Sequence, residues 1–175
     1  MTASKLGQTN AWSRLQFAKL AGARVLGTSS SDDKLAHAAA LGLDSGLNYR
    51  TTPDWDKWAL DQTDGQGVDL VVEVGGSGTF ARSLRATRPR GVIAQIGVLS
   101  NTSDPVDVRP ILIRQLRVHG VYVGSREDFL AMNQAITASR LLPVIDRVFP
   151  FAEAPAAFHH MASATHFGKI VISSE

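Results

Sequence analysis

Helix-like and strand-like stretches alternate along this chain from residue 11 onward, and glycine, proline, aspartate or asparagine marks the switches between them. Two parallel strands need a crossover connection between them, and a helix is the usual crossover. Strands that alternate with helices therefore predict a mostly parallel sheet with helices on both faces. The chain shows no internal repeat and no long linker, so we expect a single doubly wound α/β unit.

The apolar run at residues 68–74 is the clearest predicted strand, and a glycine-rich turn follows it. Ser31 is the expected N-cap of a helix, because Asp32 and Asp33 then lie at the positive helix terminus. Further strands are expected at residues 23–28, 47–49, 91–96, 116–123, 143–148 and 167–172. Helices are expected at residues 12–21, 34–41, 54–64, 78–87, 111–115, 126–139 and 154–162.

Composition and charge exclude several classes of protein. With 175 residues, of which 44% are hydrophobic and 19% charged, the chain suits one globular domain with a real core. A formal net charge of +2 gives no reason to expect a nucleic-acid partner. The absence of cysteine excludes disulfides, thiolate catalysis and zinc sites with sulfur ligands. No apolar run is long enough to span a bilayer and the first residues are polar, so we expect a cytoplasmic protein without a membrane partner.

Five stretches between residues 15 and 172 together resemble one known family. They read QFAKLAGA at residues 16–23, TSSSDDKL at 28–35, GVDLVVEVGG at 67–76, IGVL at 96–99 and HFGKIV at 166–171. Their order and spacing resemble the medium-chain dehydrogenases, which include zinc alcohol dehydrogenases and NADPH-dependent quinone oxidoreductases. The resemblance implies a Rossmann NAD(P)-binding domain at residues 1–140, atypical over 1–14. It also implies that residues 141–175 form the segment which in such enzymes returns to the catalytic domain.

The first departure from the family pattern concerns the catalytic half. Complete enzymes of the family carry an N-terminal half that holds the catalytic domain, any zinc ligands and most of the substrate pocket. Nothing in this chain resembles that half. We therefore expect no zinc in this chain and little or no dehydrogenase activity from it alone. The sequence leaves open whether the chain is an enzyme, although the resemblance is to NAD(P)-dependent oxidoreductases.

The second departure lies at the start of the Rossmann unit. The family begins with an apolar strand and a Gly-rich turn, which brings the backbone and a helix N-terminus to the pyrophosphate. Residues 2–10 read TASKLGQTN, with one glycine. The first strand and the turn are thus expected to be missing or degraded, and cofactor binding weak or lost. The strands at 23–28 and 68–74 then close up, or residues 2–7 supply a poor strand, or another chain fills the gap.

The candidate cofactor-binding residues follow the predicted strands, at the edge where open parallel sheets bind ligands. The first of these strands ends without an acidic residue for the ribose hydroxyls, which favours NADP(H) over NAD(H). Its last residues are Thr28, Ser29 and Ser30. Lys34 is close enough in sequence to reach a 2′-phosphate, and the resemblance implies that Tyr49 contacts it. The resemblance places Val74, Gly75 and Gly76 along the ribose edge, and Gly97, Val98, Leu99, Val123, Gly124 and Ser125 near the nicotinamide.

Each candidate also has a purely structural interpretation. Lys34 suits the solvated face of an N-capped helix, and Tyr49 suits a half-buried position. Glycine-rich ends of strands are typical of tight turns in any α/β protein. The turn at residues 75–78 also has the composition of an anion nest, in which successive backbone N–H groups bind an anion.

Other residue clusters carry less information about function. His159 and His160 are adjacent and cannot share one metal ion well, and His166 lies too far along the chain, so no metal site is expected. No Ser-His-Asp set or nucleophile elbow is present. A solvated helix face, without the interleaved aromatic residues of a nucleic-acid site, is the expected role of Arg82, Arg85, Arg88 and Arg90.

Three functional hypotheses follow from these observations. The first is an NAD(P)-binding domain with little activity of its own. The second is an enzyme in trans, in which a separately encoded catalytic chain docks on the apolar surface of residues 141–172. The third is a non-enzymatic dimeric interaction protein on a degenerate Rossmann scaffold. We also expect a homodimer, because the gap left by the first strand would expose unpaired backbone N–H and C=O groups. The resemblance implies a second route, since dimers of the family often pair the strand that matches residues 116–123.

Overall fold

The computed structural model describes residues 2–5, 11–100 and 102–174, and the centre of the fold is a sheet of six parallel strands. The strand order is β3-β2-β1-β4-β5-β6. This order is that of a doubly wound sheet, in which the chain starts in the middle and builds outward in both directions. The strands are β1 (Thr2–Lys5), β2 (Val25–Ser29), β3 (Ser45–Asn48), β4 (Val68–Glu73), β5 (Thr87–Gln95) and β6 (Arg117–Gly120). The predicted α/β class and parallel pairing are confirmed.

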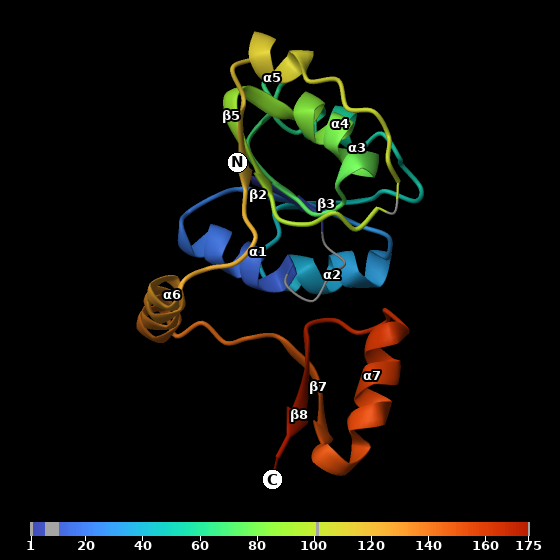
Figure 1. The fold of residues 1–175 in the computed structure, drawn as a ribbon, viewed down its shortest axis with the longest axis vertical. Coiled ribbons are helices and arrows are strands. Elements are labelled where there is room, and N and C mark those ends of the chain that lie inside the picture. The colour runs from blue at the N-terminus through green and yellow to red at the C-terminus, as the bar shows by residue number, and fades with distance from the viewer. Residues whose placement is uncertain (1, 6–10, 101, 175) are drawn as a thin grey trace.

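Helices cover both faces of the sheet (Figure 1). On one face lie α1 (Ala11–Leu20) and α2 (Asp32–Ala40), and on the other lie α3 (Trp55–Asp61), α4 (Ser77–Ala86) and α5 (Arg109–Ile113). The core is divided in the same way. Leu15, Val25, Ala38 and Leu43 form one buried cluster, and Leu26, Val68, Val71, Leu84 and Ile93 belong to the other. Strand β2 is buried along its whole length because neighbouring side chains alternate between the two clusters.

The first strand is present. Residues 2–5 pair with residues 25–28 of β2 on one side, and residues 2–4 pair with residues 70–72 of β4 on the other. Of the three possibilities raised by the sequence, a short strand supplied by the N-terminal residues is therefore the one observed. Backbone hydrogen bonds do not depend on side-chain type, so a polar segment can fill a position that two buried strands require. The sheet has no gap there for a second chain, and residues 6–10, the site of the family's glycine turn, lie outside the described residues.

A smaller unit follows the main sheet. After the exposed helix α6 (Arg126–Ser139), the strands β7 (Ile145–Pro150) and β8 (Lys169–Ser173) form a separate parallel pair, connected by α7 (Ala154–Ala162). Figure 1 shows this unit in orange and red beyond α1 and α2. Val144 and Phe167 pack into the core cluster of Leu15, and the Gln16 side-chain amide donates to the Leu142 carbonyl at 2.9 Å. The smaller unit is thus anchored to the helices α1 and α2.

The predicted element boundaries agree with the structure within a few residues. Ser31 is the N-cap of α2, and its hydroxyl accepts a hydrogen bond from the Lys34 N–H, as expected. Strand β5 begins four residues before its predicted start, because residues 87–90 continue the pairing beyond a register shift opposite β4. Strand β6 is shorter than the predicted 116–123. Among the described residues, no helix has the length and apolar character needed to cross a membrane.

Candidate nucleotide-binding site

Four groups of predicted site residues lie along one edge of the sheet. Parallel strands all point the same way, so the residues after β2, β4, β5 and β6 collect at their common carboxyl edge. Backbone hydrogen bonds join the neighbouring groups directly. The Leu99 N–H donates to the Val74 carbonyl at 3.2 Å, and the Val121 N–H donates to the Gln95 carbonyl at 2.9 Å. The structure therefore brings together residues that are up to about a hundred positions apart in the sequence.

The end of β2 is largely built into the fold. Thr28 and Ser29 are buried, and Ser30 is half-buried. The Ser29 hydroxyl accepts from the Ser31 N–H at 3.3 Å, and its carbonyl accepts from the Tyr49 N–H at 2.9 Å. Ser30 is thus the least buried of the three residues, while Thr28 lines a cavity beside the sheet. No carboxylate belongs to this strand end.

Lys34 makes a contact that the sequence did not predict. Its ammonium group donates to the carbonyl of Ala164 at 2.7 Å, and Ala164 lies in the loop between α7 and β8. The Lys34 side chain therefore holds the C-terminal unit against α2. The sequence had suggested either a phosphate contact or a solvated position for it. A phosphate at the end of β2 would share this ammonium group with the carbonyl.

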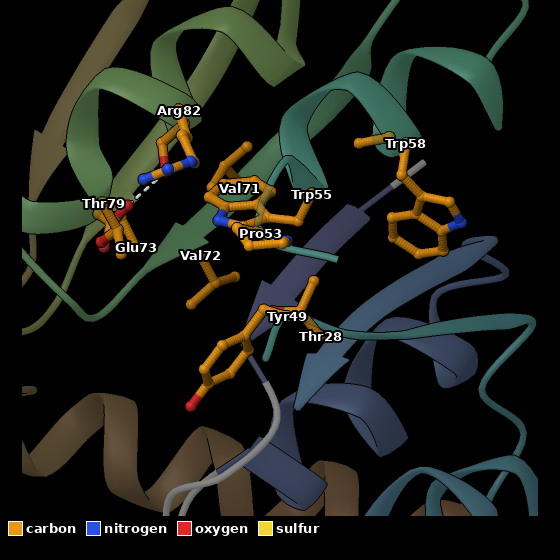
Figure 2. A pocket seen from close by; sticks show the side chains of 12 residues that line it. Thr28, Tyr49, Pro53, Trp55, Trp58, Val71, Val72, Glu73, Thr79 and Arg82 are labelled. Atoms are coloured by element: carbon orange, nitrogen blue, oxygen red, sulfur yellow. Dashed lines mark hydrogen bonds between the residues drawn. The ribbon is translucent and has the colours of Figure 1, made fainter. Parts of the chain in front are cut away.

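A cavity of about 260 Å³ opens between the sheet and the helices α3 and α4 (Figure 2). Its wall includes Tyr49 after β3, Trp55 and Trp58 on α3, and the apolar residues Val71 and Val72 of β4. Trp55 and Trp58 lie three positions apart, so one face of the helix presents both rings. The other lining residues are Thr28, Pro53, Ala59, Glu73, Thr79, Arg82 and Ser83. Flat aromatic walls with a few polar groups suit a planar heteroaromatic ligand.

The turn after β4 has a polar network that the sequence analysis missed. Glu73, the last residue of β4, is 3% exposed, and one carboxylate oxygen accepts from the N–H groups of Gly75 at 2.6 Å and Gly76 at 3.1 Å. The same oxygen accepts from the Thr79 hydroxyl at 2.6 Å, and the second oxygen accepts from the Ser83 hydroxyl. An acidic residue at the end of a buried strand, two positions before a glycine pair, is the sequence signal that could have revealed this network.

The anion-nest interpretation of residues 75–78 is not supported by these bonds. The Gly75 and Gly76 N–H groups donate to Glu73, and the Gly78 N–H donates to the Ser100 hydroxyl at 3.0 Å. A nest binds an anion through N–H groups that have no other acceptor. In this turn, Glu73 and Ser100 already accept from these N–H groups.

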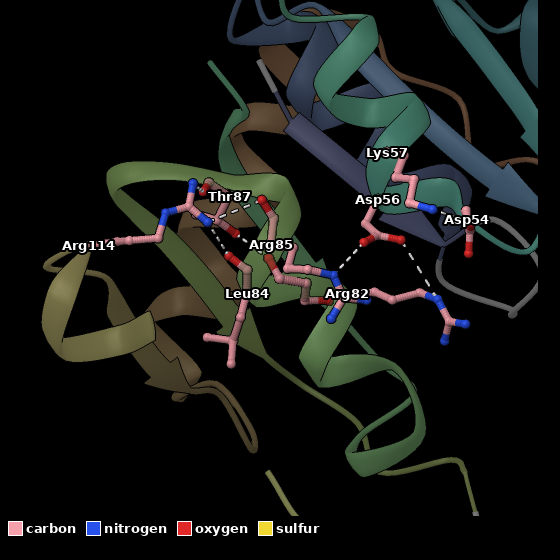
Figure 3. A network of polar contacts seen from close by, with 9 residues as sticks. Asp54, Asp56, Lys57, Arg82, Leu84, Arg85, Thr87 and Arg114 are labelled. Carbon is pink, nitrogen blue, oxygen red and sulfur yellow. Dashed lines mark hydrogen bonds and ion pairs between the residues drawn. The ribbon is translucent and has the colours of Figure 1, made fainter. Parts of the chain in front are cut away.

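A second network joins α3 to α4 behind the cavity (Figure 3). The Asp56 side chain is 3% exposed and accepts from the Arg85 guanidinium at 2.6 Å, while the nearest Arg82 nitrogen lies 3.7 Å away. Arg114 donates to the carbonyls of Leu84 and Thr87 at the end of α4. Arg88 pairs with Asp69, and Arg90 donates to Gln115. Arg85 and Arg90 are exposed and Arg82 and Arg88 are half-buried, which agrees with the predicted solvated face. The prediction did not include the pairing of Arg85, Arg88 and Arg90 with side chains of the protein.

The three histidines considered as ligands lie in the C-terminal unit. His160 is 2.7 Å from Asp146, and the two rings of His160 and His166 are 6.1 Å apart. Burial alone would raise the pKa of Asp146, but the Phe167 N–H and the His160 ring outweigh it and the pKa is lowered. Burial, followed by the nearby Lys34 ammonium, lowers the pKa of His166. The described residues contain no group of three or more His, Cys, Asp or Glu placed to hold a metal ion.

The fold and its carboxyl-edge site define a class of protein. A sheet of order 3-2-1-4-5-6 with loops gathered at the carboxyl ends of its strands is a Rossmann-like nucleotide-binding fold. Residues 14–138 match the sequence model of the zinc-binding dehydrogenase family. The chain belongs to this family.

Comparisons with individual proteins agree with this assignment. The chain is 39% identical over 162 residues to a zinc-type alcohol dehydrogenase-like protein of Schizosaccharomyces pombe, covering 90% of this chain and 47% of that protein. It is 31% identical to a 2-haloacrylate reductase of a Burkholderia species, with coverages of 89% and 50%. A solved NAD-dependent alcohol dehydrogenase superposes with a TM-score of 0.89 at 32% identity, covering 99% of this chain and 50% of that one. The chain thus spans about half the length of the relatives it matches.

Proposed function

We propose that this chain is the NAD(P)-binding domain of an oxidoreductase of the zinc-type alcohol dehydrogenase or quinone oxidoreductase-like kind. The observation that carries the proposal is the position of the aromatic cavity. It opens beside the ends of β2 and β4, the half of a Rossmann sheet that receives the adenosine part of a dinucleotide. Gly97 to Leu99 and Val123 to Ser125 follow the strands on the other half, where the nicotinamide part belongs.

The same proposal assigns NADP(H) as the preferred cofactor. Ser30 follows β2 directly and Lys34 lies in the first turn of α2, and β2 ends without the carboxylate that binds the ribose hydroxyls of NAD. The acidic residues of this stretch, Asp32 and Asp33, come in the first turn of α2. The Lys34 ammonium donates one hydrogen bond to the Ala164 carbonyl, and its other N–H groups can donate to the phosphate. One related structure is of an NAD-dependent enzyme, so the preference needs a direct test.

Little or no dehydrogenase activity is proposed for these 175 residues alone. In the relatives, about half of the chain has no counterpart here. The surface that a catalytic chain would cover is the C-terminal unit. There Leu142, Phe151 and Phe158 are exposed, although large apolar side chains are usually buried. A separate catalytic chain is therefore the proposed partner of residues 141–175.

Fluorescence titration with NADPH and NADH tests the proposal, because Trp55 and Trp58 line the cavity. We expect quenching that saturates below about 0.1 mM, roughly −5.5 kcal/mol, with NADPH ahead of NADH. Lys34→Gln is expected to weaken NADPH by about tenfold and to leave NADH binding unchanged, because only NADPH carries the 2′-phosphate that the ammonium group would contact. Lys57→Gln, which removes an exposed lysine paired with Asp54, is the matched control. No saturation with either nucleotide would contradict the proposal.

A homodimer through β6 is also proposed. Strand β6 is the last strand of the main sheet, so its outer edge carries backbone groups without a neighbouring strand in the described residues. Val121, Tyr122 and Val123 continue from this edge with exposed apolar side chains, and Tyr122 is 97% exposed. We expect sedimentation of a dimer at tens of micromolar, and of a monomer for Tyr122→Asp. A monomer of the unaltered protein under those conditions would rule this dimer out.

A non-enzymatic interaction protein is the second candidate function. Exposed apolar side chains around β6, α6 and the C-terminal unit favour this function. Such a surface suits a protein partner of any kind as well as it suits a catalytic chain. The nucleotide titration separates the two functions. Capture of a stable protein partner whose binding is indifferent to either nucleotide would favour the interaction protein.

A further inference from the structure

Glu73 is a buried carboxylate whose charge has no salt-bridge partner among the described residues. A buried charge of this kind is stable only when hydrogen-bond donors replace the water it has lost. Glu73 has four donors, namely the N–H groups of Gly75 and Gly76 and the hydroxyls of Thr79 and Ser83. Two belong to the turn after β4 and two to α4, so one carboxylate ties the turn to the helix.

The turn depends on this carboxylate because it has almost no side chains of its own. Gly76 has φ +82, and a Cβ there would lie 2.9 Å from the Val98 Cα. A Cβ on Gly75 would lie 2.2 Å from the Thr79 hydroxyl oxygen. Both positions therefore require glycine, whose backbone is the least restricted of any residue. Glu73 holds the turn from the protein side, and Ser100 holds it from the other side by donating to the Gly75 carbonyl at 2.6 Å.

The same residues shape the proposed adenosine site. Glu73, Thr79 and Ser83 all line the cavity, and Figure 2 shows Glu73 beside Thr79 at its wall. Gly75 and Gly76 come two and three positions after Glu73, the last residue of β4. The Gly75 and Gly76 N–H groups donate to Glu73 and the Gly78 N–H donates to Ser100, so these three donors already have acceptors. A phosphate is thus kept out of this turn, although a glycine-rich strand-to-helix turn is often where phosphates bind.

We propose that Glu73 is a positioning residue for the cofactor. One of its side-chain oxygens accepts from the Gly75 and Gly76 N–H groups, which fixes their backbone in the shape that the adenosine ribose contacts and leaves neither N–H group free for a phosphate. This inference rests on the proposed nucleotide-binding function. The conformation of the turn can nevertheless be measured without any cofactor.

The test compares Glu73→Gln with Glu73→Asp. Glutamine keeps one oxygen within reach of both glycine N–H groups, and its amide can donate to the Ser83 hydroxyl. Aspartate keeps the charge but withdraws the carboxylate by about 1.5 Å, beyond hydrogen-bonding reach of the turn. Glu127→Gln and Glu127→Asp, at an exposed position of α6, are the matched controls.

Amide hydrogen exchange measured by NMR reports on the turn directly. We expect Gly75 and Gly76 to exchange at least about tenfold faster in Glu73→Asp than in the unaltered protein, while the β4 and β5 amides keep their protection. Glu73→Gln is expected to stay within about threefold of the unaltered protein. Inorganic phosphate at millimolar concentration is expected to leave the two glycine signals of the unaltered protein unchanged.

Nucleotide affinity gives the second readout. We expect NADPH and NADH to bind at least about tenfold more weakly to Glu73→Asp, and within about threefold of normal to Glu73→Gln. Equal weakening in both variants, or normal binding to Glu73→Asp, would overturn the proposal, as would phosphate-induced shifts of the glycine signals. If the unaltered protein binds no nucleotide, the proposed function fails. In that case the exchange data alone show whether Glu73 holds the turn, and normal exchange in Glu73→Asp overturns that as well.

Discussion

Gly97→Ala is expected to lower the free energy of unfolding by about 1–3 kcal/mol and to weaken NADPH binding at least about tenfold. A Cβ at this position would lie 2.7 Å from the Val74 carbonyl oxygen and 3.2 Å from the Val74 Cα. These are backbone atoms of the turn that follows β4, so they cannot move aside as the end of a flexible side chain could. Displacing Val74 would also break the bond from the Leu99 N–H and shift Gly75.

Gly120→Ala is the matched control for this substitution. Gly120 ends strand β6, as Gly97 follows strand β5, but an added Cβ there meets no atom within 4 Å. We expect its free energy of unfolding to stay within about 0.5 kcal/mol of normal and its nucleotide affinity to be unchanged. Urea unfolding and the fluorescence titration measure both quantities. If Gly97→Ala behaved like Gly120→Ala, the close approach between the β4 and β5 loops would not be as tight as the structure has it.

Leu84→Ala is expected to cost about 2–5 kcal/mol of stability, the largest effect of any substitution proposed for this chain. Leu84 is 2% exposed and belongs to the core cluster that also contains Leu26, Val71 and Ile93. It fastens α4 to the sheet, and α4 carries Thr79 and Ser83 of the Glu73 network. Truncation leaves a cavity that rigid strands cannot fill, so both the transfer free energy and packing contacts are lost.

Leu112→Ala is the matched control, because it removes the same atoms from an exposed leucine. Leu112 lies on α5, on the same side of the sheet, but is 80% exposed. We expect a change of no more than about 0.5 kcal/mol there, against a melting temperature roughly 10 °C lower for Leu84→Ala. Thermal and urea unfolding give both values. A mild effect of Leu84→Ala would mean that α4 packs more loosely than the structure shows.

The element types could be read from the sequence because burial leaves a periodic pattern in it. The run at residues 68–74 is mostly apolar because helices cover both faces of the sheet at β4, with Asp69 and Glu73 as its two acidic residues. The Ser31 cap was recognisable because capping needs a specific side chain. The strand at residues 2–5 was harder to predict. Its polar side chains carry no strand pattern, and its place in the sheet is set by the pairing needs of β2 and β4.

The candidate site was predictable only in part. Strand ends at one sheet edge follow from parallel topology, so Thr28, Gly75 and Gly97 could be placed together in advance. The cavity wall formed by Trp55 and Trp58 could not, because it requires α3 and α4 to lie side by side on the same face of the sheet. Lys34 also gained a partner, Ala164, that lies 130 positions away in the chain.

The sequence by itself determined the α/β class, the order of helices and strands, and the family, because local periodicity and short motifs are properties of neighbouring residues. Only the tertiary structure decided what each charged group does. In the sequence, Glu73 and the arginines at 82–90 are ordinary polar residues. Folding gave Glu73 its hydrogen-bond donors and gave the arginines their acceptors. For Glu73 burial makes the pairing obligatory, since a buried polar group without a partner is unstable, whereas the arginines pair nearer the surface. The partner in each case is chosen by the packing of the elements, which no local pattern records.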